Sequence, residues 1–286
     1  MNRKSERTHK LPDFLIIGSM KSGTTGIFQD LATHPDIYSG GNKEPQNLTS
    51  DKVLTDNGIK NYSQEFKAAK PQQLICDAST AYAKRPDFER VSFRASKVLS
   101  NDFKVIYIVR QPVDRIVSQY HHEFVNGDID IGIDEAVFKE TRFINYSRYH
   151  YQLEPWLEVV SLNRIRIIKF EDYVKNRESV IKSLWEFLGL DESISFEISS
   201  EVHNKSENKK YLTSGWETII TSRAYRRFAS SISPKIKEYV KDKVLPETKI
   251  EKPVLKKETE EWIYAQTATD MAKLRTLCGY DKITWD

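Results

Sequence analysis

Near its N-terminus the chain has an apolar run that ends in glycine and is followed by a loop of small and hydroxyl residues. Residues 13–18 read Asp-Phe-Leu-Ile-Ile-Gly, which predicts a buried strand. A helix is expected from Gly23 to about His34, where His34-Pro35 ends it. The loop between them, residues 18–25, therefore meets a helix N-terminus. Free backbone N–H groups there favour an anion, so the unit predicts a phosphate-like ligand.

Further segments of the chain alternate between strand and helix patterns. Strands are predicted at 73–76, 104–109 and 164–170, and helices at 112–125, 147–160, 173–188 and 258–271. This alternation predicts an α/β fold with a central parallel sheet and right-handed crossovers. Ligands of such sheets bind beyond the carboxyl ends of the strands, and Gly18, Asp77 and Arg110 follow three of those ends.

Composition narrows the class of protein. The 286 residues are 39% hydrophobic and 30% charged, which is typical of a globular chain, and we expect a single domain over 1–286 with a flexible polar N-terminus at 1–11. A net charge of +3 argues against a nucleic-acid binder, and no apolar run approaches the ~18 residues of a membrane span. Cys76 and Cys278 form no metal-ligand pattern, so no metal is expected. We expect a cytoplasmic enzyme.

Two segments carry residues suited to separate anionic groups. In the first loop, Lys21 supplies a full charge, Gly23 allows close backbone approach, and Thr24 and Thr25 supply hydroxyl donors. Lys21 precedes the glycine, so the loop differs from the nucleoside-triphosphate loop Gly-x-x-x-x-Gly-Lys-Ser/Thr. Arg110 follows the strongest predicted strand, and with Ser118 on the next helix it forms a plausible second phosphate site.

Taken together, the two segments resemble the sulfotransferases that use 3'-phosphoadenylyl sulfate (PAPS). Lys21-Ser-Gly-Thr-Thr25 resembles the 5'-phosphosulfate loop of that family, and Arg110-x-Pro-x-x-Arg115-x-x-Ser118-x-Tyr120 resembles its 3'-phosphate motif. Lys43-Glu-Pro45 is similar to a stretch of the carbohydrate and heparan-sulfate branch. The resemblance implies a P-loop-NTPase-like three-layer fold, PAPS as the donor and 3',5'-bisphosphoadenosine (PAP) as the product, with no metal.

The resemblance also implies roles for residues in the two segments and beyond them. Lys21 would stabilise the leaving phosphate oxygen, while Ser22, Gly23, Thr24 and Thr25 complete the 5' site and Arg110 and Ser118 hold the 3'-phosphate. Lys209 and Lys210, in a stretch similar to the late basic loop of the family, are candidates for the 3'-phosphate, although a solvated loop is an equal interpretation. Several related enzymes have Lys and His where this chain has Ala78 and Gln46, so the likeness to them is incomplete.

The acceptor side of the reaction needs a general base. The carbohydrate-branch resemblance places that carboxylate at Glu44, whose alternative role is a loop ion pair with Lys43 or Lys21. His121 and His122 are rival bases because imidazole titrates near neutral pH. This assignment favours O-sulfation over N-sulfation of a carbohydrate or similar hydroxylated acceptor.

Three further residues are candidates for acceptor contacts. Asp77 and Ser79 lie in a segment that resembles the corresponding segment of the carbohydrate branch. An alternative role for Asp77 is to orient Lys21 or Ser79. Tyr149 belongs to an aromatic segment that suits sugar faces, and helix core packing is its alternative.

Two other functions compete with the sulfotransferase. One is a nucleotide-dependent kinase on a related fold, for which magnesium dependence and ATP hydrolysis would be evidence. The other is a non-catalytic binder of sulfated glycans through residues 201–250, which carry 11 Lys and Arg against 6 Asp and Glu.

Overall fold

The computed structural model describes residues 9–39, 44–195, 252–279 and 285. Its centre is a five-stranded parallel sheet in the order β2-β3-β1-β4-β5. The strands are β1 (Phe14–Gly18), β2 (Ile37–Tyr38), β3 (Leu74–Ala78), β4 (Lys104–Val109) and β5 (Ile165–Lys169). The predicted strands at 13–18, 73–76, 104–109 and 164–170 are confirmed within two residues at each end, and the short edge strand β2 is additional.

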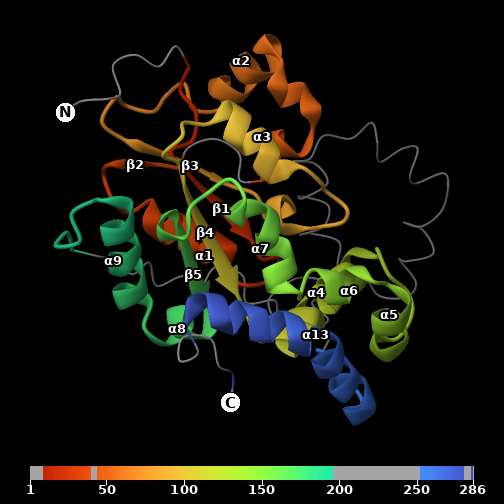
Figure 1. The fold of residues 1–286 in the computed structure, drawn as a ribbon. Helices are drawn as coiled ribbons and strands as arrows, with labels where there is room; N and C mark the ends of the chain where they lie inside the picture. The colour runs from red at the N-terminus through yellow and green to blue at the C-terminus, as the bar shows by residue number, and fades with distance from the viewer. Residues whose placement is uncertain (1–8, 40–43, 196–251, 280–284, 286) are drawn as a thin grey trace, which may run out of the picture.

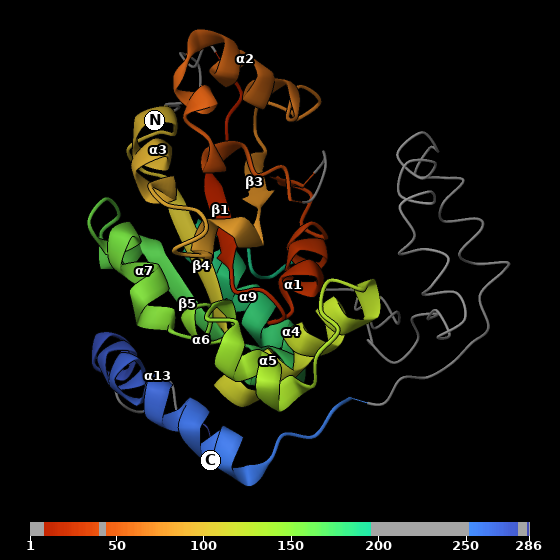
Figure 2. The same ribbon diagram turned by 90° about the vertical axis from the view of Figure 1, so that its right-hand side faces the viewer.

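Helices cover both faces of the sheet (Figures 1 and 2). Those before β4 are α1 (Thr24–Leu31), α2 (Asp56–Gln64) and α3 (Val91–Val98). The others are α4 (Pro112–Asn126), α5 (Ile133–Lys139), α6 (Arg142–Asn145), α7 (Tyr149–Leu157), α8 (Phe170–Lys175), α9 (Arg177–Leu188) and α13 (Lys257–Cys278). The predicted helix at 173–188 is wrong as a single element, because α8 ends and α9 begins around Asn176, whose φ of −132° is not helical.

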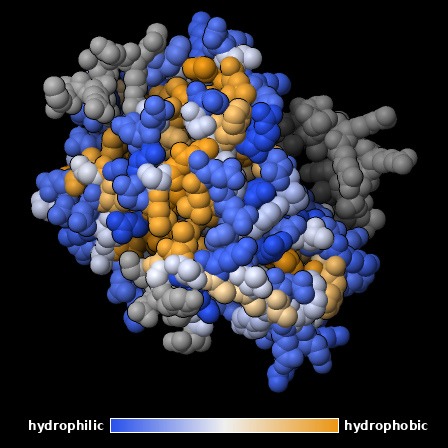
Figure 3. Space-filling model, viewed as in Figure 1, coloured by the Kyte–Doolittle hydropathy of each residue, from blue (hydrophilic) through white to orange (hydrophobic). Residues whose placement is uncertain are grey.

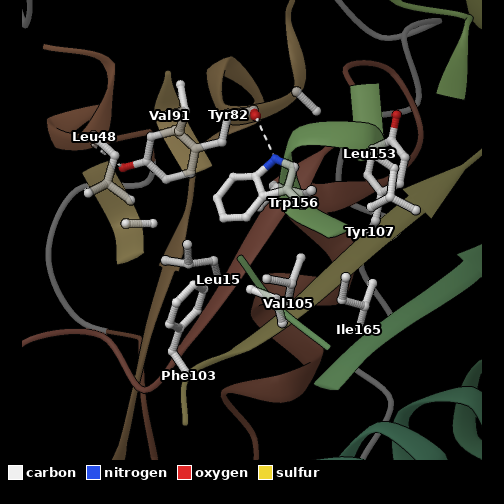
Figure 4. Packing of buried hydrophobic residues seen from close by; sticks show 14 of the residues in the cluster. Leu15, Leu48, Tyr82, Val91, Phe103, Val105, Tyr107, Leu153, Trp156 and Ile165 are labelled. Carbon is white, nitrogen blue, oxygen red and sulfur yellow. Dashed lines mark hydrogen bonds between the residues drawn. The ribbon is translucent and has the colours of Figure 1, made fainter. Parts of the chain in front are cut away.

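Alternate residues of the central strands face two different cores, which is why the strands read as continuous apolar runs. On β1, Leu15 and Ile17 pack with residues of α2, α3, α7 and α13, whereas Phe14 and Ile16 pack with residues of α1 and α9. Figure 4 shows the first of these cores, in which Trp156 of α7 lies over β1 and β4. The result is a three-layer α/β arrangement of helices, sheet and helices.

A third apolar cluster lies among α4, α5, α6 and α13, beside the sheet. Helix α13 is joined to the neighbouring helices by polar contacts as well. The Asp270 carboxylate accepts from the backbone N–H groups of His150 and Tyr151 at 2.9 and 2.8 Å, at the start of α7. The Gln111 side-chain amide donates to the Tyr264 hydroxyl at 2.6 Å, at the start of α4.

The ends of the described chain are attached to this body. In the segment expected to be a flexible tail, the Lys10 ammonium donates to the carbonyls of Lys67 and Ala69 at 2.9 and 2.6 Å, and Leu11 packs on the first core.

Figure 3 shows hydrophilic side chains over most of one face of the molecule, around a central apolar area. No helix among the described residues combines the length and the apolar character that a bilayer span requires.

Candidate active site at the carboxyl ends of the strands

The loop after β1 is fixed to the end of β4. Both the backbone N–H and the hydroxyl of Ser19 donate to the carbonyl of Ile108, at 2.7 and 2.9 Å. The Ser22 hydroxyl lies 2.6 Å from that of Ser19, and the Ser22 N–H donates to the Ser19 carbonyl at 3.2 Å. Both serines are fully buried. Ser22, predicted to contact the donor, therefore shapes the loop through both its backbone and its side chain.

The loop then turns through two left-handed residues into α1. Lys21 has a φ of 67° and Gly23, the N-cap of α1, a φ of 80°. A Cβ at Gly23 would lie 2.6 Å from Cε2 of Phe170, so this position requires glycine for space as well as conformation. No side chain caps α1, and its first turn has no acidic residue. Its N-terminus thus keeps the dipole and N–H groups that favour an anion.

Arg110 joins the two predicted phosphate segments. Its Nη1 donates to the Lys21 carbonyl at 3.1 Å, and its guanidinium lies 4.9 Å from the centroid of the Phe170 ring. The Arg110 Nε is buried without a hydrogen-bond partner among the described residues. A buried, unpaired donor on a cation carries a free-energy cost that an anionic ligand would remove. The structure therefore places the Arg110 guanidinium beside the backbone of the Lys21 loop.

Helix α4 carries the remainder of the second segment. Pro112 occupies its first turn, and the Gln111 side chain accepts from the Asp114 N–H at 2.7 Å. Asp114 also forms an ion pair of 3.8 Å with Arg110, and Ser118 lies one turn further along the same face. The side of α4 that carries Asp114, the partner of Arg110, thus also carries the half-buried Ser118.

The second arginine of the motif is a packing residue. Arg115 is fully buried and donates to Ser147, Gln119 and the carbonyl of Phe143, each at 2.8 Å. Burial lowers the pKa of Arg115. It therefore holds α4 to α6 through hydrogen bonds within the protein.

Glu44 lies at the carboxyl end of β3. Its N–H donates to the carbonyl of Ala78 at 2.9 Å, and Ala78 is in register with Ile16, two residues before the end of β1. The Glu44 Oε2 accepts from the N–H and the hydroxyl of Thr80, at 2.7 and 3.2 Å. The predicted base is thus placed at the same sheet edge as the β1 loop. The rival bases belong to the middle of α4, where His121 is buried.

The three predicted acceptor contacts are all buried. Asp77 accepts from Ser79, which confirms the alternative role that the sequence offered for it. Tyr149 is 0% exposed, and its hydroxyl donates to the carbonyl of Arg110 at 2.6 Å. Burial raises the pKa of Tyr149 to about 12. Tyr149 therefore packs in the core, which was the alternative interpretation of its segment, and it also supports the backbone of Arg110.

Three residues near the predicted site, Phe170, Thr80 and Lys84, were not predicted from the sequence. Phe170 packs against both Gly23 and Arg110, and it follows β5, a fourth strand end at the same edge of the sheet. Thr80 binds Glu44 and lies inside a motif already singled out. Lys84 has its pKa lowered by burial, an effect that the nearby charge of Glu44 opposes.

Several predicted features fall outside the described residues, namely Lys43, Lys209, Lys210 and the basic region 201–250. Within the described part of the chain, no group of three or more His, Cys, Asp and Glu side chains is suited to a metal ion.

A parallel sheet whose first strand leads through a glycine-containing loop to the N-terminus of a helix defines a P-loop-like α/β protein. Residues 11–244 match the sulfotransferase domain family, and the chain belongs to that family. It is similar to heparan sulfate glucosamine 3-O-sulfotransferase 3A1 of Mus musculus, with 26% identity over 65% of this chain and 47% of that protein. It is also similar to membrane-associated sulfotransferase kil1 of Dictyostelium discoideum, with 36% identity over 39% of this chain and 23% of that protein. The chain thus spans less than half the length of these relatives.

Solved structures support the fold. A sulfotransferase from Alicyclobacillus acidocaldarius matches 94% of this chain and 96% of its own, with a TM-score of 0.64 and 18% identity. The mouse sulfotransferase SULT7A1, solved in complex with PAP, matches 96% of this chain and 89% of its own, with a TM-score of 0.50 and 16% identity.

Proposed function

We propose that this protein transfers a sulfuryl group from PAPS to a hydroxyl of a carbohydrate or glycolipid acceptor. The observation that carries the proposal is the position of Arg110, which binds the Lys21 loop through Nη1 and keeps a buried, unpaired Nε. The chain therefore offers two adjoining anion sites, and a donor with phosphates at both the 5' and 3' positions would fill both. The PAP bound in the mouse neighbour supports this choice of donor.

In the proposed mechanism the acceptor oxygen displaces PAP from sulfur in line. The S–O bond to the acceptor forms while the bond from sulfur to the bridging phosphate oxygen breaks. The Lys21 ammonium stabilises the negative charge that develops on the leaving oxygen. Thr24, Thr25 and the N-terminus of α1 hold the 5'-phosphate, and Arg110 and Ser118 hold the 3'-phosphate.

The acceptor must lose its proton during the transfer, and we assign that proton to the Glu44 carboxylate. Its Oε2 is anchored by Thr80, so the carboxylate is held in place, as a general base needs to be. The heparan sulfate relative supports a carbohydrate acceptor and O-sulfation. The cytoplasmic location and the single domain over 1–286 stay predictions.

The first experiment is calorimetric titration with PAP, 5'-AMP and ATP in the absence of magnesium. We expect PAP to bind most tightly because the 3'-phosphate reaches Arg110. Arg110→Ala should weaken PAP binding by ~1.5–3 kcal/mol, the value of a lost charge-assisted contact. Arg166→Ala is the matched control, since Arg166 lies near the opposite end of the sheet. Equal affinity for PAP and 5'-AMP would overturn the assignment of the 3' site and favour a kinase or a non-catalytic binder.

The second experiment follows PAP release from PAPS with heparan sulfate, chitooligosaccharides and a glycosphingolipid as acceptors. Glu44→Gln should slow turnover by ~10²-fold or more while PAP affinity stays unchanged. Normal turnover in this variant would return the base role to His121, His122 or the acceptor itself. Glycan binding that needs no donor and survives Lys21→Ala would favour the non-catalytic binder.

A further inference from the structure

The turn that carries Glu44 is held in an unfavourable backbone conformation. Glu44 and Gln46 have φ values of 64° and 56°, in the left-handed region that non-glycine residues seldom occupy. Such residues persist where the surrounding contacts hold them. The Glu44 N–H bond to Ala78 is one such contact, and two more come from hydroxyl groups below the turn.

These hydroxyls belong to Ser79 and Tyr82. The Gln46 N–H donates to the Ser79 hydroxyl at 3.2 Å, and the Leu48 N–H points to the Tyr82 hydroxyl at 3.5 Å. Figure 4 shows the hydroxyl end of the Tyr82 ring beside Leu48. Both hydroxyls thus serve as acceptors for the backbone of the turn.

Asp77 lies beneath both hydroxyls. Its Oδ1 accepts from Ser79 at 3.1 Å, and its Oδ2 accepts from Tyr82 at 2.7 Å and from Tyr62 at 2.5 Å. The residue is 1% exposed, and the partners of its carboxylate are these three hydroxyls. Both carboxylate oxygens are therefore occupied by neighbouring hydroxyls, and the acceptor has no route to them.

The charge of Asp77 determines which way these hydroxyls point. An ionised carboxylate only accepts hydrogen bonds, and each hydroxyl has a single hydrogen to donate. Ser79 and Tyr82 must direct their hydrogens to Asp77, which leaves their lone pairs for the N–H groups of Gln46 and Leu48.

We propose that Asp77 is a positioning residue that acts through Ser79 and Tyr82 to fix the turn carrying Glu44. This inference rests on the proposed role of Glu44 as the base. It replaces the expectation that Asp77 and Ser79 contact the acceptor. An amide at position 77 would donate to one hydroxyl oxygen and compete with an N–H of the turn for its lone pairs, so the hydrogen bond to that N–H would weaken.

The first test does not depend on any acceptor. Amide hydrogen exchange of the ¹⁵N-labelled full chain is measured by NMR in Asp77→Asn and Ser79→Ala. We expect exchange at Gln46 to accelerate at least ~10-fold, as an amide loses its partner. Tyr62→Phe is the matched control, because it removes a hydroxyl from the same carboxylate without touching the turn. Unchanged exchange at Gln46 and Leu48 in Asp77→Asn would overturn the inference.

The second test links the turn to the reaction through a double-mutant cycle. Turnover is followed as PAP release from PAPS with heparan sulfate as the acceptor probe. We expect Asp77→Asn to lower kcat ~10–100-fold with PAP affinity unchanged, and to cause no further loss in the Glu44→Gln background. Losses that multiply in the double variant would show that Asp77 does not act through Glu44. If Glu44→Gln alone leaves kcat unchanged, the base assignment fails, and the exchange experiment still decides whether Asp77 holds the turn.

Discussion

Replacing Gly23 by alanine tests how the two proposed anion sites are joined. A methyl group there would lie 2.6 and 2.7 Å from Cε2 and Cδ2 of Phe170, well inside carbon–carbon contact, and the φ of 80° disfavours any Cβ. The left-handed conformation costs a non-glycine residue ~1–2 kcal/mol and an extra methyl in a packed site ~1–3 kcal/mol. Gly23→Ala should therefore lose roughly 2–5 kcal/mol of stability, a fall in Tm of roughly 4–20 °C by calorimetry.

The same substitution should also weaken donor binding. The Phe170 ring that must move lies 4.9 Å from the Arg110 guanidinium, so its displacement moves Arg110 as well. We expect the Kd for PAP to rise at least about tenfold, as when one charge-assisted hydrogen bond is weakened. Isothermal titration calorimetry of the folded variant measures this effect.

Gly127→Ala is the matched control for the backbone cost. Gly127 has a φ of 75°, but no atom lies within 4 Å of the place that a Cβ would occupy, so only the conformational penalty applies. The double variant Gly23→Ala/Phe170→Leu should recover part of the lost stability because the smaller side chain reduces the overlap. A Gly23→Ala protein as stable as Gly127→Ala, with unchanged PAP affinity, would show that Phe170 does not constrain this position.

Two further predictions concern buried carboxylates. Asp30 accepts from the Tyr173 hydroxyl at 2.6 Å and from Nε and Nη2 of Arg177 at 2.7 and 2.6 Å. Asp30→Asn should therefore lower the free energy of unfolding, measured with urea, by ~2–4 kcal/mol. This loss is somewhat smaller than for a fully buried ion pair because Arg177 is partly exposed. Burial raises the pKa of Asp77 to about 6, so the folded state binds this proton more tightly than the unfolded state. The unfolding free energy of the wild type relative to Asp77→Asn should therefore rise by roughly 1 kcal/mol as the pH falls from about 7 to about 5.

Each of these predictions has an outcome that contradicts it. Asp172→Asn removes an exposed carboxylate near the same helices and is the control for Asp30→Asn. Equal losses of unfolding free energy in the two variants would show that the Asp30 contacts contribute little to stability. For Asp77, a pH slope identical in the wild type and the variant would show that this carboxyl does not titrate in the window. If the Asp77 inference holds, turnover falls over the same interval in which stability rises.

The central strands could be predicted from the sequence because both of their faces are buried in apolar surroundings. Their residues are therefore mostly apolar, which is the local pattern of a buried strand. Lys104–Val109 reads as a strand and is one. Helix α2 escaped prediction because only Tyr62 and Ser63 in it are buried, leaving no apolar stripe. The break at Asn176 escaped because apolar residues continue on both sides of it.

The site residues also differ in whether local sequence or packing determines their role. Lys21 and Arg110 were singled out because their motifs follow predicted strand ends, where topology brings side chains together, whereas Glu44 was singled out by the family resemblance alone. The role of Phe170 depends on its contact with Gly23, in a segment far away in the sequence, which no local pattern encodes. Tyr149 looks the same in sequence whether it faces a sugar or the core, and only packing decides between them.

The position of α13 has a consequence for synthesis. Asp270 and Tyr264 on this helix support the starts of α7 and α4, the latter next to Arg110. All five strands of the described residues precede residue 170, so a ribosome releases the sheet and the Lys21 loop long before the helix that braces the start of α4. A nascent chain therefore completes the sheet before the contacts of Tyr264 and Asp270 with the starts of α4 and α7 can form.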